Sequence, residues 1–127
     1  MKPYWTISLF VLLLSPALLA NEVEKSALGK MIFFDPNLSS PKGQSCASCH
    51  NPQQGFADEG KVVSEGAKKG LFGNRNAPSI AYSNFTPDWH YNKEDETWIG
   101  GFFLDGRALT MEEQAKGPFL NPVEMGN

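Results

Sequence analysis

Apolar and polar residues recur with a helical period in one segment near the N-terminus, residues 22–34. Apolar side chains repeat there at spacings of three and four, which places one set on a single side of a helix: Val23, Ala27, Leu28, Met31 and Ile32. Pro36 is expected to stop this helix. A second helix is predicted for residues 111–116, because Thr110 and Glu113 form a capping-box pattern, and Gly117-Pro118 is expected to end it.

The rest of the chain shows little regular periodicity. Residues 53–76 are rich in glycine and lysine and are predicted to form a long ordered loop. Residues 83–97 mix aromatic with charged residues, which suggests an exposed excursion anchored by its rings. A short helical turn is expected to open at Cys46 and to end or bend at Asn51-Pro52. Because strand signals are weak throughout, we expect an all-α fold with long loops.

The N-terminal 20 residues have the pattern of a secretory signal peptide. Lys2 precedes an apolar run over residues 7–19 that Pro16 interrupts, and Ala20 offers a small residue at a cleavage point. An uncleaved anchor is the alternative, although the run is shorter than the roughly 20 apolar residues of a membrane span. We therefore predict a signal peptide over residues 1–20 and one exported domain over residues 21–127.

The chemistry of this domain centres on Cys46-Ala47-Ser48-Cys49-His50. Two thiols three residues apart can each bind a vinyl group of one haem, and the adjoining imidazole can then ligate its iron. Covalent attachment also suits an exported protein. The pattern therefore predicts a covalently bound haem c, held by Cys46, Cys49 and His50.

Other sites can be built from the same residues. A zinc site would use every cysteine and histidine of the chain, His90 included, with a spacing unlike that of a zinc finger. A redox-active dithiol normally follows a buried strand, and the proline-rich and glycine-rich residues 36–43 do not predict one. A disulfide between cysteines so close together would constrain little of the chain.

Charge and size agree with a small haem protein. Removing residues 1–20 takes one lysine from the 11 basic residues and none of the 14 acidic ones, which leaves a formal net charge of −4. This balance gives no indication of nucleic acid binding. A domain of this length has a modest core, to which a large prosthetic group would add apolar contact.

Several short blocks of the chain occur in the order found in one protein family. They are Leu28-Gly29-Lys30, Phe33-Phe34-Asp35, the Cys46–His50 motif, Arg75-Asn76-Ala77-Pro78-Ser79, Asp105-Gly106-Arg107, Glu113-Gln114-Ala115-Lys116-Gly117-Pro118 and Glu124-Met125. In this arrangement the chain resembles the N-terminal, peroxidatic haem domain of bacterial dihaem cytochrome c peroxidases, a family that includes the MauG-like enzymes. The resemblance implies a cytochrome c-like haem domain.

The resemblance also implies roles for individual residues. His50 would be the proximal iron ligand, and Gln114 and Glu124 would line the distal face. Glu124 would be the acid and base that moves a proton between the two oxygens of hydrogen peroxide, whereas Gln114 can only position the peroxide. Asn76 corresponds to a calcium-binding position, and Arg75 and Arg107 are candidates to pair with haem propionates.

Three departures from the family pattern affect these expectations. Residues 64–74 lack the histidine that closes the distal site in some members, so we expect an open site, with His90 or a methionine (Met31, Met111 or Met125) as the alternative sixth ligand. Leu104 stands where many members have a tryptophan assigned to electron transfer. A second haem motif is absent, so the chain is expected to be an incomplete, N-terminal part of a larger dihaem protein.

The sequence thus predicts a periplasmic peroxidase domain that reduces hydrogen peroxide with electrons from a small cytochrome c or cupredoxin. Its C-terminal partner would be a second haem domain, and the family is often homodimeric. Two alternatives remain at this point: a monohaem electron-transfer cytochrome without peroxidase activity, and a MauG-like haem oxidase that acts on a protein substrate.

Overall fold

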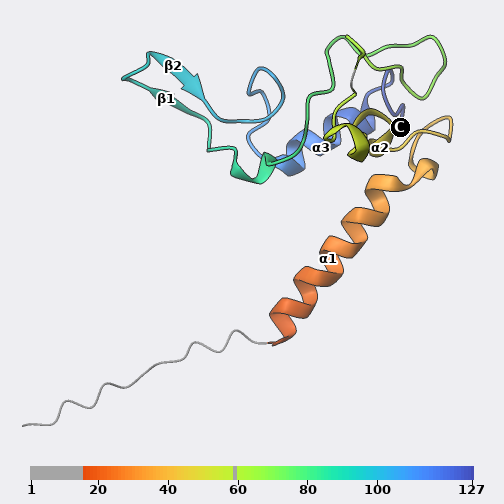
Figure 1. The fold of residues 1–127 in the computed structure, drawn as a ribbon, viewed down its shortest axis with the longest axis horizontal. Helices are drawn as coiled ribbons and strands as arrows, with labels where there is room; N and C mark the ends of the chain where they lie inside the picture. The colour runs from red at the N-terminus through yellow and green to blue at the C-terminus, as the bar shows by residue number, and fades with distance from the viewer. Residues whose placement is uncertain (1–15, 59) are drawn as a thin grey trace, which may run out of the picture. The chain divides into compact units, whose positions relative to one another are not determined.

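The computed structural model describes residues 16–58 and 60–127 (Figure 1). The chain divides into two compact units, residues 1–30 and residues 31–127, and the second contains every candidate site residue named above. Most of the predicted signal peptide, residues 1–15, lies outside the described residues. No helix within the described part is long and apolar enough to cross a membrane.

The first helix, α1, covers Pro16–Phe34 and confirms the helix predicted for residues 22–34. It ends where expected, because Asp35 begins a short 3₁₀ turn over Pro36–Leu38. The Asp35 carboxylate accepts the backbone N–H of Asn37 at 2.8 Å. This hydrogen bond lowers the pKa of Asp35.

The helical turn predicted at the cysteine motif is also present. Helix α2 covers Cys46–Cys49. Ser45 precedes its first residue, and the backbone N–H of Ser45 donates to the Ser48 hydroxyl at 3.0 Å. The turn stops before Asn51, where a 3₁₀ helix over Pro52–Gln54 takes the chain in a new direction. Local sequence signals therefore determine both ends of the motif.

Helix α3 covers Met111–Leu120 and is longer than predicted. Thr110 caps it as expected, accepting the N–H of Glu113 at 3.2 Å. The prediction that Gly117-Pro118 would end it is wrong. Tertiary contacts hold this last turn, because the Pro118 carbonyl accepts the N–H of Met125 at 3.2 Å and Gly117 packs directly against the ring of Phe103.

A short β-hairpin adds a two-stranded sheet that the all-α prediction did not include. Strands β1 (His90–Asn92) and β2 (Thr97–Ile99) pair antiparallel, with Tyr91 opposite Trp98 (Figure 1). The two rings meet edge to face at 5.5 Å, and Trp98 also stacks on Trp89 at 5.2 Å. The prediction of an exposed excursion anchored by rings agrees with this hairpin, since Tyr91 and Trp98 remain exposed.

The loop between α2 and the hairpin is long, as predicted for residues 53–76. Apart from the 3₁₀ helices Pro52–Gln54 and Ser83–Phe85, the described residues between α2 and the hairpin contain isolated bridges but no helix or strand. The Ala67 N–H donates to the Glu124 carbonyl at 2.7 Å, and Gly66 lies against the backbone of Val123. The loop is therefore fastened to the C-terminal segment that carries Glu124.

The apolar core is very small for a domain of this length. Among the described residues, Ala108 and Met125 are the buried hydrophobic side chains, and no large side chain is fully buried. Large apolar side chains instead remain accessible in many places, for example Leu104 at 64%. A further apolar body would remove part of this surface from water.

Gly106 lies tightly against the ring of Trp89. It has φ of +67°, and a Cβ there would lie 2.0 Å from the Trp89 ring. We expect Gly106→Ala to lower the free energy of unfolding, measured with urea on the haem-loaded protein, by about 2–4 kcal/mol. Gly70→Ala is the matched control, because Gly70 has φ of +81° and open space. We expect Gly70→Ala to lower the free energy of unfolding by about 1 kcal/mol. Equal losses in the two variants would contradict the packing role of Gly106.

Candidate functional site

The two thiols of the motif are free and half-buried at the two ends of α2. Burial raises the pKa of the Cys46 thiol. Burial likewise raises the pKa of Cys49, with the negative charges of Asp58 and Glu124 adding to the increase and the Ser64 hydroxyl opposing it. Neither thiol is in a disulfide, so both sulfurs are available for thioether bonds.

The imidazole of His50 is oriented by the backbone. Its Nδ1 lies 3.1 Å from the carbonyl oxygen of Phe56, and a proton on Nδ1 would leave the lone pair of Nε2 free to ligate a metal. Phe56 is itself fixed in a left-handed conformation, with φ of 60°, and its N–H donates to the Asn51 carbonyl at 2.8 Å. The turn after α2 thus holds the His50 ring through Nδ1 and leaves Nε2 available.

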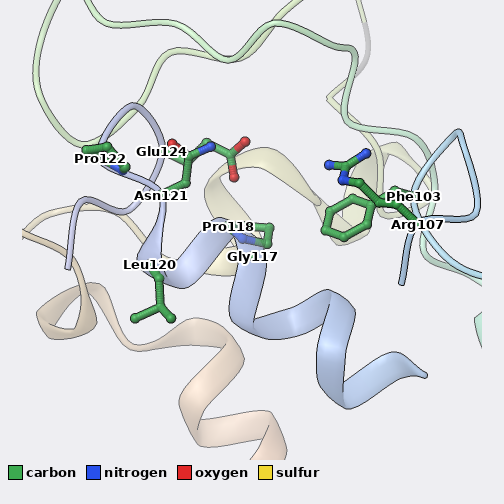
Figure 2. A pocket seen from close by; sticks show the side chains of 8 residues that line it. All are labelled: Phe103, Arg107, Gly117, Pro118, Leu120, Asn121, Pro122 and Glu124. Carbon is green, nitrogen blue, oxygen red and sulfur yellow. The ribbon is translucent and has the colours of Figure 1, made fainter. Parts of the chain in front are cut away.

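A cavity of about 370 Å³ lies beside α3 (Figure 2). Its floor is the last turn of α3 at Gly117 and Pro118, and the side chains of Glu124 and Arg107 stand on either side of that floor. The full lining is Phe103, Arg107, Gly117, Pro118, Leu120, Asn121, Pro122 and Glu124. Glu124 and Arg107 are the two charged members of this lining, and they have opposite charge.

The backbone of Glu124 is hydrogen-bonded on both sides, whereas its side-chain carboxylate has no partner among the described residues. Its N–H donates to the Asn121 carbonyl at 3.0 Å, and its carbonyl accepts the N–H of Ala67 at 2.7 Å. Among the described residues, no hydrogen bond or ion pair engages the carboxylate. Ala67 in turn lines a second cavity together with Cys49. The segment that carries Glu124 is thus hydrogen-bonded to the loop that shares a cavity with Cys49.

Gln114 is half-buried on α3 and does not line the cavity with Glu124. Asn76 is exposed, and its amide donates to the Lys61 carbonyl at 2.8 Å. The described part of the chain holds no cluster of three histidine, cysteine or acidic residues able to bind a metal ion. The distal role of Gln114 and the calcium role of Asn76 therefore remain predictions.

The alternative sixth ligands lie in different surroundings. His90 is exposed on β1, and its Nδ1 lies 2.7 Å from the Asp88 carbonyl. Met31 and Met111 are exposed, whereas Met125 is buried. None of these four residues lines the cavity that contains Glu124.

Sequence reasoning missed the arrangement around Arg107. Its guanidinium lies over the Phe103 ring, 3.6 Å from the centroid, and donates to Asp105 at 2.7 Å. Arg75 donates to the other oxygen of Asp105 at 2.8 Å. The two arginines expected to pair with haem propionates thus meet on one carboxylate here. The opposite charges in Asp105-Gly106-Arg107 were a local signal for part of this cluster.

The two arginines hold the pKa of Asp105 at about 2, below its usual 3.8. A depressed pKa means that the ion pairs stabilise the fold above pH 3.8 and lose this effect as the pH falls through about 2. We expect an NMR titration of the Asp105 carboxyl carbon to have its midpoint near 2. A midpoint near 3.8 would show that the ion pairs do not form in solution.

The residues present fit a covalently attached haem. The donor set comprises two free thiols in one helical turn and an imidazole whose Nε2 is available. The exposed apolar side chains and the very small core provide the contact surface that a large flat apolar group would cover. Cys46, Cys49 and His50 would hold this group, and Glu124 would lie near it.

Comparison with known proteins agrees with this fit. The model of a family described as di-haem cytochrome c peroxidase matches residues 23–127. Over 105 residues the chain is 44% identical to the methylamine utilization protein MauG of Paracoccus denitrificans, covering 79% of this chain and 27% of that protein. It is 39% identical over 112 residues to the cytochrome c peroxidase Ccp of Escherichia coli, and the match covers 88% of this chain and 21% of that protein.

A solved structure is similar over the same region. The diheme peroxidase BthA from Burkholderia thailandensis E264 has a TM-score of 0.74 and 46% sequence identity, covering 80% of this chain and 26% of that one. The chain therefore spans about a quarter of the length of these relatives.

Proposed function

Because the chain belongs to the di-haem cytochrome c peroxidase family, we propose that residues 21–127 form a haem c domain that reduces hydrogen peroxide to water. The observation that carries this proposal is the carboxylate of Glu124, which lines a cavity and has no hydrogen-bond partner among the described residues. The Glu124 carbonyl accepts the N–H of Ala67, and Ala67 lines a second cavity together with Cys49. Peroxide reduction needs a proton carrier such as this carboxylate.

Different residues of the chain would bind the haem and move the proton. A bound haem would supply the iron at which peroxide accepts two electrons. Cys46 and Cys49 would fix the haem covalently, and His50 would ligate the iron through Nε2. Glu124 would take the proton from one peroxide oxygen and return it to the other, so that two electrons and two protons convert one peroxide into two waters. Gln114 would orient the peroxide, and Asn76 would contribute to a calcium site.

The direct experiment is donor oxidation by the haem-loaded chain. Hydrogen peroxide is added to the chain with a reduced small cytochrome c or cupredoxin, and loss of the reduced donor is followed by absorbance. Two donor molecules oxidised for each peroxide would support the proposal. A low-spin ferric spectrum that peroxide does not change would instead indicate an electron carrier with His90 or a methionine as the sixth ligand.

A MauG-like oxidase is the second candidate, because the 44% identity to a MauG protein lies between the 39% and 46% identities to two peroxidases. Such an enzyme would use the same cavity and would oxidise side chains of a protein substrate. Peroxide consumption without donor oxidation, together with oxidised side chains in an added protein, would favour this candidate.

The cellular location and the partner domain that we propose rest on the N-terminal sequence and on the share of the relatives' length that the chain covers. The apolar run before Ala20 supports export to the periplasm. Because the chain spans about a quarter of its relatives, we propose a second haem domain as the partner that delivers electrons. Homodimer formation remains a prediction.

A further inference from the structure

Arg107 is the positively charged side chain of the cavity and is fixed from two sides. Asp105 accepts from Nη1 at 2.7 Å, and the Phe103 ring lies 3.6 Å beneath the guanidinium (Figure 2). We propose that Arg107 is the anion-binding residue of the cavity and that Asp105 is its positioning residue, an inference that rests on the proposed function. The anion is the hydroperoxide that forms when peroxide gives a proton to Glu124.

The proton step explains why a cation is needed opposite Glu124. One O–H bond of hydrogen peroxide breaks, its proton goes to a Glu124 oxygen, and the bonding electron pair stays on the peroxide as a negative charge. Arg107 stands on the other side of the Gly117-Pro118 floor, where it can meet that charge. The guanidinium has five N–H donors, so the bond to Asp105 leaves others free for an anion.

Asp105 positions the guanidinium group of Arg107. It is bound by Arg75 at 2.8 Å as well as by Arg107, so its charge partly neutralises both cations and keeps them together. With an uncharged residue at position 105, Arg75 and Arg107 would repel each other, and Arg107 would lose one of its two anchors. The Phe103 ring alone would then orient the guanidinium.

Fluoride and imidazole, added separately to the haem-loaded chain at pH 7, test this role through equilibrium binding. Fluoride is a small anion and imidazole an uncharged ligand, and both change the visible spectrum when they occupy an open haem site. Because Arg107 is half-exposed, we expect Arg107→Gln to weaken fluoride binding by about tenfold and Arg107→Lys by about threefold. Asp105→Asn should weaken it by about threefold. Imidazole affinity should stay the same in all three variants.

Lys25→Gln is the control, because Lys25 also forms an exposed ion pair, with Glu22 at 3.0 Å, but does not line the cavity. Its fluoride affinity should remain within about twofold of the unchanged chain. Unchanged fluoride affinity in Arg107→Gln would overturn the inference, as would equal losses for fluoride and imidazole, which would show a merely structural role. Failure of the unsubstituted chain to bind either ligand would instead count against the proposed open haem site.

Discussion

Replacing Glu124 with glutamine is expected to slow the reaction of the haem-loaded chain with hydrogen peroxide by about 100-fold or more, the usual size of a lost acid-base contribution. The amide has nearly the shape of the carboxylate but can neither take nor release a proton at neutral pH. Because the described structure shows no partner for the Glu124 carboxylate, the substitution should leave the fold intact. Stopped-flow absorbance of the haem after peroxide is added measures the rate.

Glu112→Gln is the control for this experiment. Glu112 is an exposed carboxylate in the first turn of α3 and does not line the cavity. Glu112→Gln removes the same charge from the chain as Glu124→Gln. The rate at which this variant reacts with peroxide should stay within about twofold of that of the unsubstituted protein. A Glu124→Gln variant that reacts as fast as this control would remove Glu124 from the mechanism.

The second large effect concerns the two thiols. The double variant Cys46→Ser and Cys49→Ser should retain no haem on a denaturing gel stained for haem, because serine hydroxyls do not form the thioether bonds. Its folded state should also be far less stable, since the described residues bury very little apolar surface by themselves. Thermal unfolding followed by circular dichroism measures this loss.

Ala47→Ser provides the comparison for the double variant. Ala47 lies between the cysteines in the same turn and is half-buried, so the variant adds a hydroxyl without removing a thiol. It should keep covalent haem and most of its thermal stability. Haem that stays bound to the double variant after denaturation would show that the thiols are not the attachment points.

The parts of the fold that were predictable have local causes. The capping of α3 by Thr110 and the turn after His50 each depend on residues a few positions apart. The packing of the hairpin and of the last turn of α3 depends on contacts between residues further apart, such as Trp89 with Gly106 and Phe103 with Gly117. Single-sequence patterns do not reveal which distant residues meet.

The same distinction holds for the site. Cys46, Cys49 and His50 were recognisable because their chemistry depends on short spacing, and the structure leaves both thiols and one imidazole nitrogen available. The cavity role of Arg107 was not foreseen, because it depends on the ring of Phe103 and on the position of α3. Stacking of this kind leaves no spacing pattern in the sequence.

Mass spectrometry of the purified chain tests the central claim most directly. We expect a mass increased by one haem per chain, with the haem on the proteolytic peptide that contains Cys46 and Cys49. Two unmodified thiols, or a disulfide between Cys46 and Cys49 in protein produced with haem supplied and an active haem-attachment system, would contradict it.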